Sequence, residues 1–157
     1  MLRKFDEAEN ILRQDLNETY FWNGFRGIPK SFLLGELYLE AGKKEQARAA
    51  YAAALPSLKE MKEKAEPEGW TFLLAQAYAG MGQKAEALGA SERAMENGAA
   101  DLEGVAKAYA TLGDAKDAVP ILRHLLAVPS GVHREQLRVD PAWDPLRGDS
   151  SFQRLLQ

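Results

Sequence analysis

Histidine and cysteine, the residues that most often bind metals or act as nucleophiles and proton carriers, are nearly absent from this sequence. It has no cysteine and only two histidines, His124 and His133. Neither has a second histidine at the spacing that metal ligands use. The composition therefore excludes cysteine nucleophiles, thiolate metal sites and disulfides. We expect both histidines to face solvent or to pack against neighbours.

Three aspartates near the end of the chain are the next candidates for chemistry. Asp140, Asp144 and Asp149 lack the alternate-residue spacing and the terminal glutamate of a calcium loop. Ser91 has no neighbouring base in the sequence and is interpreted as a packing residue. We therefore predict a protein that is not an enzyme, with no metal and no cofactor.

The charge balance narrows the class of partner. Lys and Arg number 20 against 23 Asp and Glu, which gives a net charge of -3. This argues against nucleic acid and against a polybasic membrane patch. Residues 1–7 lack the apolar stretch of a secretory signal, and the longest apolar run, 49–55, is too short to span a bilayer. We expect a cytoplasmic protein whose partner is a protein or peptide.

A pattern of six positions occurs three times along the chain. The structural elements that it forms must position any functional residues. The copies are Leu34, Gly35, Tyr38, Gly42, Ala47 and Leu55; then Leu74, Ala75, Tyr78, Gly82, Ala87 and Met95; then Val105, Ala106, Tyr109, Gly113, Ala118 and Leu126. Spacing within each copy is constant, and apolar residues recur at helical period. Each unit is therefore predicted to be a helix, a glycine-containing turn and a second helix.

The glycine and alanine positions carry the packing of each unit. A glycine just past a helix end allows the left-handed backbone that closes the helix. Small residues on first helices, such as Gly35 and Ala75, should face Ala47 and Ala87 on second helices and allow close approach. The residues assigned to this structural signature are Gly35, Tyr38, Gly42, Ala47, Tyr78, Gly82, Ala87, Tyr109, Gly113 and Ala118.

The N-terminal segment, residues 3–17, resembles a second helix without its first. Its apolar stripe is Phe5, Ala8, Ile11, Leu12 and Leu16, in which Ala8 and Leu12 take the places of Ala47 and Tyr51. A partner helix would then lie upstream, so the chain is either a piece of a longer protein or begins with its own capping helix. We favour the first alternative.

Four aromatic residues lie between this helix and the first repeat. Tyr20, Phe21, Trp22 and Phe25 are predicted to form a loop, and no strand is predicted anywhere. The loop either packs over the end of the core or exposes an apolar patch to a partner.

The C-terminal segment is predicted to close the core. Asp140-Pro141 and Asp144-Pro145 indicate helix starts, and Asp149 should cap a helix over 150–156. A terminal repeat has no neighbour to cover its apolar surface. The lid over that surface should be formed by Trp143, Leu146, Phe152 and Leu155.

The first repeat resembles the tetratricopeptide repeat. The signature positions present are Leu34, Gly35, Tyr38, Gly42, Ala47, Tyr51, Ala54 and Leu55, with Ser31 in place of the signature tryptophan. The resemblance implies an all-α fold: a right-handed α-α superhelix of stacked helix-turn-helix repeats, here with an extra N-terminal helix and C-terminal capping helices.

A narrower resemblance covers residues 28–157. The ending, 125–130 followed by 137–149 and Phe152, is similar to the helical-repeat tail behind the effector domains of some bacterial serine/threonine kinases, adenylate cyclases and winged-helix regulators. It implies a regulatory or docking segment of a bacterial signalling protein. We divide the single domain 1–157 into an N-terminal helix and aromatic loop (3–27), three repeats (28–67, 68–98 and 99–129) and a C-terminal cap (130–157).

In such a stack the first helices line a concave groove where a partner would bind. The predicted groove residues are Phe32, Glu36, Leu39, Phe72, Gln76, Ala79, Glu103 and Lys107, followed by Ala110. Family members that bind the carboxylate tail of chaperones use Lys, Asn and Arg there, so that ligand is not expected. The two phenylalanines favour an apolar or amphipathic helix as ligand. Alternatively, both rings pack between the repeats.

The sequence therefore predicts a non-catalytic module that docks a peptide or helix in its groove. One alternative is a structural role, in which the open N-terminal end mediates a homodimer. A third possibility, a small-molecule sensor, would need a deep polar pocket that the sequence does not indicate.

Overall fold

The computed structural model describes residues 4–22, 25–64, 70–96, 101–129 and 131–157; the side chains of 21, 22, 25, 26 and 62–64 lie outside that description. The elements in chain order are α1 (Phe5–Gln14), β1 (Thr19–Trp22), β2 (Phe25–Pro29), α2 (Lys30–Glu40), α3 (Lys44–Lys64), α4 (Thr71–Gly80), α5 (Lys84–Glu96), α6 (Leu102–Thr111), α7 (Ala115–Ala127), α8 (Arg134–Val139), the 3-10 helix η1 (Pro141–Leu146) and α9 (Ser150–Leu155).

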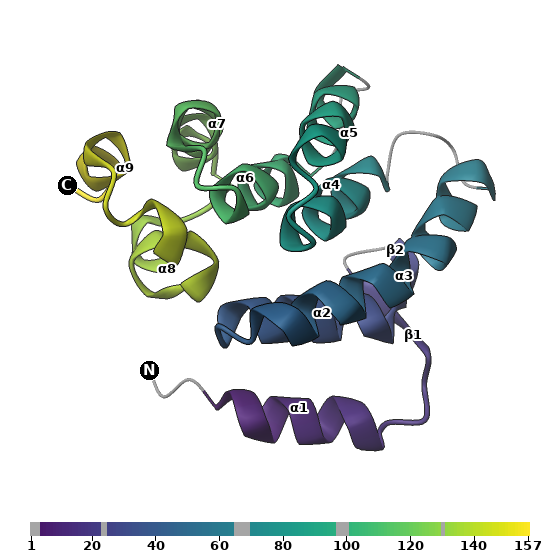
Figure 1. Cartoon of the computed structure of the whole chain (residues 1–157). Helices are drawn as coiled ribbons and strands as arrows, with labels where there is room; N and C mark the ends of the chain where they lie inside the picture. The colour runs from purple at the N-terminus through teal and green to yellow at the C-terminus, as the bar shows by residue number, and fades with distance from the viewer. Residues whose placement is uncertain (1–3, 23–24, 65–69, 97–100, 130) are drawn as a thin grey trace.

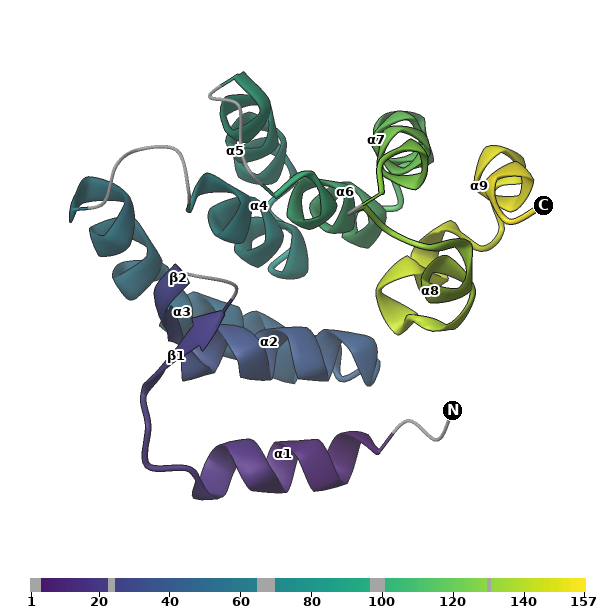
Figure 2. The same cartoon turned by 180° about the vertical axis from the view of Figure 1, so that it is seen from behind.

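The six central helices form three antiparallel hairpins, α2 with α3, α4 with α5, and α6 with α7. The first helices α2, α4 and α6 contact one another in order, and the hairpins stack side by side (Figures 1 and 2). At the C-terminal end η1 packs on α6 and α9 packs on α7, so the cap continues both layers of the stack. The prediction of an all-α fold of stacked helix-turn-helix repeats is confirmed.

The three hairpin turns share one backbone geometry. Gly42, Gly82 and Gly113 have φ angles of 74°, 76° and 70°, the left-handed region that glycine adopts without steric cost. In each turn the next residue donates its N–H to the carbonyl of the signature tyrosine; for example, the Lys43 N–H lies 2.8 Å from the Tyr38 oxygen. This hydrogen bond closes each first helix as a Schellman motif. The predicted role of the glycines is confirmed.

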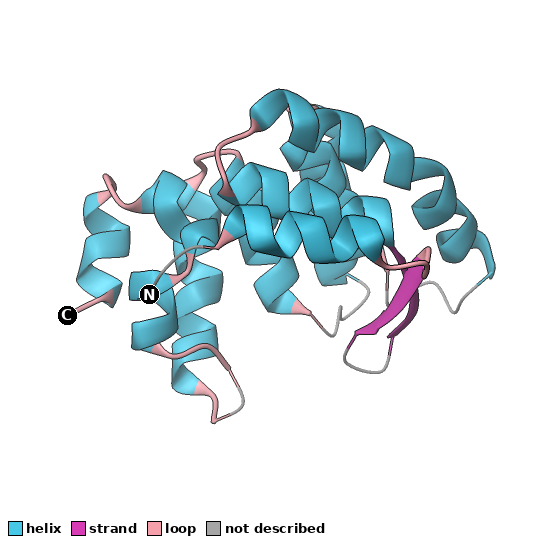
Figure 3. Ribbon diagram, turned by 90° about the horizontal axis from the view of Figure 1, so that it is seen from below, coloured by secondary structure: helices cyan, strands magenta, loops and turns pink. Residues whose placement is uncertain are grey.

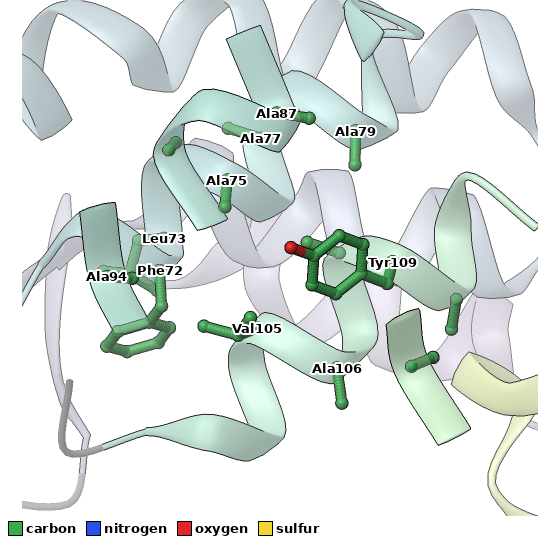
Figure 4. Packing of buried hydrophobic residues seen from close by; sticks show 14 of the residues in the cluster. Phe72, Leu73, Ala75, Ala77, Ala79, Ala87, Ala94, Val105, Ala106 and Tyr109 are labelled. Carbon is green, nitrogen blue, oxygen red and sulfur yellow. The ribbon is translucent and has the colours of Figure 1, made fainter. Parts of the chain in front are cut away.

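Small residues allow the close approach of the helices, although one predicted pair differs. The alanines at the predicted contact positions in the second and third hairpins are fully buried, and Ala75, Ala87 and Ala106 are drawn in Figure 4. At Gly35, however, the nearest atoms belong to the Tyr51 ring, 2.7 Å from the point where a Cβ would lie, instead of to Ala47. Gly80 meets the other edge of that ring. Glycines on α2 and α4 therefore make room for Tyr51 between them.

The aromatic segment forms an antiparallel hairpin, so the prediction of a loop without strands is wrong. Tyr20 pairs with Ile28 and Trp22 with Phe25, with an irregularity between the two pairs (Figure 3). Aromatic residues favour strands, and the sequence between these two carries Asn-Gly, a strong hairpin signal. β2 contacts α2 and α3, and Ile28 is buried there. The side chains of Phe21, Trp22 and Phe25 are outside the described part, so their exposure stays a prediction.

Helix α1 is shorter than the predicted 3–17 and lies along α2. Its contact with α2 includes a polar network. The Glu9 carboxylate accepts from the Tyr38 hydroxyl (2.9 Å), the Lys43 ammonium (3.0 Å) and the Arg13 guanidinium (2.9 Å). Hydrogen bonds from Lys43, Arg13 and Tyr38 lower the pKa of Glu9 to about 2. Charged side chains therefore help to hold α1 against α2.

The C-terminal lid closes the core largely as predicted. Trp143, Leu146, Phe152 and Leu155 are buried. Asp140 accepts the Ala142 N–H at the start of η1, and Asp149 caps α9 through the Ser151 and Phe152 N–H groups. The predicted helix start at Asp144-Pro145 is wrong, because both residues lie inside η1 and Asp144 accepts a hydrogen bond from Arg147 at 2.7 Å.

Candidate functional site

A pocket of about 400 Å³ lies in the groove of the first helices. Its walls come from α2, α4 and α6, from Tyr51 of α3, and from η1, which faces the groove from the C-terminal cap. The main lining residues are Glu36, Leu39, Glu40, Tyr51, Gln76, Lys107, Thr111, Pro141, Ala142, Asp144 and Pro145. Its volume falls within the range of about 300–1,000 Å³ typical of ligand pockets.

Half of the eight predicted groove residues line this pocket. They are Glu36, Leu39, Gln76 and Lys107. Glu103 lies beside it: its carboxylate is 3.2 Å from the Lys107 ammonium and accepts a hydrogen bond from Gln136 at 3.0 Å.

The other predicted groove residues, Phe32, Phe72 and Ala79, are corrected to core positions, as is Ala110. Phe32 is 2 % exposed and meets the Tyr51 ring edge to face, with 5.5 Å between centroids. Phe72 is 4 % exposed and packs against Gly104 where α4 and α6 approach closely. Both rings pack between the repeats, which is the alternative that the sequence had left open.

Glu36 is the most unusual group of the pocket. No residue in the described part of the chain forms a hydrogen bond or an ion pair with its carboxylate. Burial raises its pKa to about 7; Lys107 opposes this shift, while Glu40, Asp101 and Asp140 add to it. Glu36 is partly exposed at the pocket wall, and a carboxylate that loses much of its hydration is costly to ionise without a partner. Glu36 is thus ready to gain from a cation or a hydrogen-bond donor.

Lys107 does not supply that partner. Its ammonium is engaged by Glu103. Burial lowers the pKa of Lys107, but Glu103, Glu36 and Asp140 outweigh this and leave it above its ordinary value. Lys107 therefore stays protonated, and Glu103 shares its charge.

Two further polar side chains lining the pocket lack hydrogen bonds to the residues described. Gln76 is only 8 % exposed, and Tyr51 only 1 %. Burial, and the nearby charges of Glu36 and Glu40, raise the pKa of the Tyr51 hydroxyl well above its usual range. None of the polar atoms of Gln76 and Tyr51 is among the fully buried, unpaired side-chain atoms of the described residues, so these atoms keep contact with the open space of the pocket. An amide, a hydroxyl and a carboxylate that form no hydrogen bond with a described residue therefore line one pocket.

The sequence could identify only part of this site. The spacing of a small residue and a tyrosine, Gly-x-x-Tyr in the first repeat and Ala-x-x-Tyr in the second, places Glu36 and Gln76 on first helices. Tyr51 was assigned to the repeat signature and Thr111 to none. The η1 wall depends on how the cap folds back over α6, for which no local signal exists.

The remaining candidates for chemistry stay apart. His124 and His133 are exposed, and Ser91 is buried in α5. Across the described ranges no group of three or more metal-ligating side chains is brought together. None of the helices in those ranges combines the length and apolar character needed to cross a membrane.

Comparison with known proteins gives one match. A family model of the tetratricopeptide repeat matches residues 31–55, which cover α2 and the first half of α3. No curated protein and no solved structure matches the chain. The narrower likeness to the tails of bacterial kinases, cyclases and regulators therefore stays a prediction. Repeats of this family generally mediate contacts between proteins. The match identifies a tetratricopeptide repeat at residues 31–55, and the stacked hairpins of the described residues are consistent with a helical repeat of that type.

Proposed function

We propose that this chain is a non-catalytic interaction module that docks a peptide segment of a partner protein at the pocket between α2, α4, α6 and η1. The observation that carries the proposal is the set of unpartnered polar groups, Glu36, Gln76 and Tyr51, on the wall of that pocket. A ligand with matching donors and acceptors would gain hydrogen bonds to these groups in a partly enclosed site.

The burial of Phe32 and Phe72 changes the kind of peptide that fits. An apolar helix anchored on these rings would need them at the surface, and both are in the core. The groove instead offers a pocket with polar groups at its wall and apolar residues such as Leu39 and Pro141 beside them. A segment that inserts one side chain into the pocket suits these walls better.

The test is selection of random displayed peptides on the immobilised chain, followed by measurement of their binding to two tryptophan variants. Thr111→Trp should fill the pocket, whereas Ala52→Trp adds the same indole to an exposed position of α3. We expect selected peptides to bind the wild type and the Ala52 variant and to lose at least tenfold in affinity for the Thr111 variant. Equal binding to both variants would contradict docking at this pocket.

Self-association through the N-terminal end remains the second proposal. Ile11 on α1 is 63 % exposed and Leu16 just after it is 94 % exposed. Sedimentation equilibrium of the wild type and of Ile11→Arg measures the role of this surface. A dimer that the substitution dissociates supports the proposal, and a monomer at millimolar concentration contradicts it.

A further inference from the structure

The charges around the pocket indicate which side chain it receives. Glu36, Glu40 and Asp144 line it on the acidic side, and Lys44 and Lys107 on the basic side. Lys107 is already paired with Glu103 and Asp144 with Arg147. Lys107 also attracts Glu36 through space, but no described residue forms a hydrogen bond or an ion pair with the Glu36 carboxylate. An incoming anion would be repelled by Glu36. An incoming cation would give Glu36 the ion pair that it lacks.

The second observation is independent of the acidic groups. Gln76, more than nine-tenths buried, faces the pocket from α4 with an amide that nothing in the described chain satisfies. The Tyr51 ring lies against Gly35, the neighbour of Glu36, and against Gly80 on α4. Its hydroxyl is also left without a described partner. The pocket wall therefore offers several hydrogen-bond acceptors on α2, α3 and α4, and not one carboxylate alone.

Building on the proposed docking function, we infer that the pocket is a guanidinium site, occupied by an arginine side chain of the partner segment. A guanidinium group has five donors in a planar fork and can reach a carboxylate and a neighbouring amide or hydroxyl oxygen at once. It is also more weakly hydrated than an ammonium, so it loses less on entering a closed pocket. The apolar walls, Leu39, Pro141 and Pro145, suit the methylene stem.

The first experiment uses peptide libraries with one fixed central residue, either arginine or citrulline, and random flanks. Citrulline has the shape of arginine without its charge. We expect the immobilised wild type to retain the arginine library about tenfold more than the citrulline library, as a charge-assisted hydrogen bond would require. Glu36→Gln should abolish this ratio, and Glu92→Gln, at an exposed position of α5, should preserve it.

Equal retention of both libraries by the wild type would overturn the inference, as would an arginine preference that survives Glu36→Gln. Failure of the docking function looks different. In that case Thr111→Trp and Ala52→Trp would retain every library equally. Circular dichroism of each variant establishes that its helices are intact.

The second experiment separates a partner's arginine from a free guanidinium compound. Agmatine, which carries the same group, is titrated into the isotopically labelled chain while NMR follows the Gln76 side-chain amide. Shifts at Gln76 that Glu36→Gln removes support the guanidinium site. If agmatine caused these shifts but the chain did not retain the arginine library, the inference that the guanidinium group belongs to a partner segment would be overturned. Absence of shifts together with equal library retention would overturn the site itself.

Discussion

The two ends of the helical stack are closed by different physical means. At the C-terminal end, Trp143 of η1 and Phe152 of α9 are fully buried, and these two helices pack on α6 and α7 of the last hairpin. At the N-terminal end, no described side chain of α1 is buried, and Glu9 binds Tyr38 and Lys43 of the first hairpin. Apolar burial is worth several kcal/mol per large side chain, and partly exposed ion pairs are worth far less. The C-terminal cap therefore contributes strongly to the stability of the fold, whereas α1 is a weakly held, peripheral helix, here called an attachment.

This difference also decides which end builds the pocket. η1 contributes Pro141, Ala142 and Pro145 to its wall, and no described residue of α1 lines it. Helix α2 separates the two environments, because Glu36 and Tyr38 lie two residues, about 200°, apart on an α-helix. The Tyr38 hydroxyl is hydrogen-bonded to α1, and Glu36 lines the pocket. The substitutions below test this contrast, in order of decreasing effect.

Trp143→Ala should have the largest effect. Truncation of a fully buried tryptophan removes its apolar contacts and leaves a cavity, so we expect a loss of about 3 to 5 kcal/mol in the free energy of unfolding. Urea denaturation measures this loss. Ile11→Ala, at the opposite end, should cost less than about 0.5 kcal/mol. Similar losses at the two ends would remove the contrast between cap and attachment.

Glu36→Gln should stabilise the protein, by an amount that depends on pH. The native pKa of about 7 lies above the ordinary 4.5, so the folded state binds the proton more tightly than the unfolded state does. Stability therefore falls as the pH rises from about 4.5 to 7, and the glutamine variant escapes this loss. We expect a gain of about 1 to 3 kcal/mol at pH 8 and none at pH 4.

Chemical denaturation at both pH values measures this gain. Glu92→Gln is the matched control, because it makes the same substitution at an exposed site on α5. If the glutamine variant at position 36 proved less stable at pH 8, the Glu36 carboxylate would have to be partnered in the free protein, and the contrast with Glu9 would fail.

Tyr38→Phe should cost about 0.5 to 1.5 kcal/mol, the usual net value of a hydrogen-bonded hydroxyl. The substitution keeps the buried ring but removes the group that donates to Glu9 and accepts from Arg13 at 2.7 Å. Hydrogen exchange of α1 amides should accelerate, while that of α6 amides stays unchanged. Acceleration in both helices would show that α1 is coupled to the whole stack and is not a separate attachment.

Local chemistry explains which parts of the fold could be predicted. Gly42, Gly82 and Gly113 were located correctly because a helix end needs the left-handed conformation at one position, which glycine adopts. The caps at Asp140 and Asp149 follow from the same kind of local rule. The strands were missed because the aromatic residues were interpreted as a loop, although an Asn-Gly pair lies between them.

The groove could be predicted only in part, because α4 is buried nearly all round. Its buried residues run from Thr71 to Ala77 and include Ala79, so no polar stripe marks the face toward the groove. Phe72 was therefore assigned to that face although it lies in the core, whereas Gln76 does line the pocket. The pKa of Glu36 depends on burial by several helices, which sequence spacing does not reveal.

Glu9→Gln should have the smallest effect and the opposite pH dependence to Glu36→Gln. The native pKa of Glu9, about 2, lies below the ordinary 4.5, so its ion pairs stabilise the fold fully above about pH 4.5 and are lost as the pH falls through 2. The variant should melt at a lower temperature than the wild type at pH 7, and this difference should shrink toward pH 2 and in high salt. Thermal melts from pH 2 to 8 measure this difference in melting temperature.

The Lys43 and Arg13 side chains are partly open to solvent, so their ion pairs with Glu9 should contribute little. A decrease in melting temperature larger than that caused by Tyr38→Phe would mean that α1 is held mainly by charge. If the decrease in melting temperature did not depend on pH, the contact between α1 and α2 would instead be stabilised by packing around Tyr38.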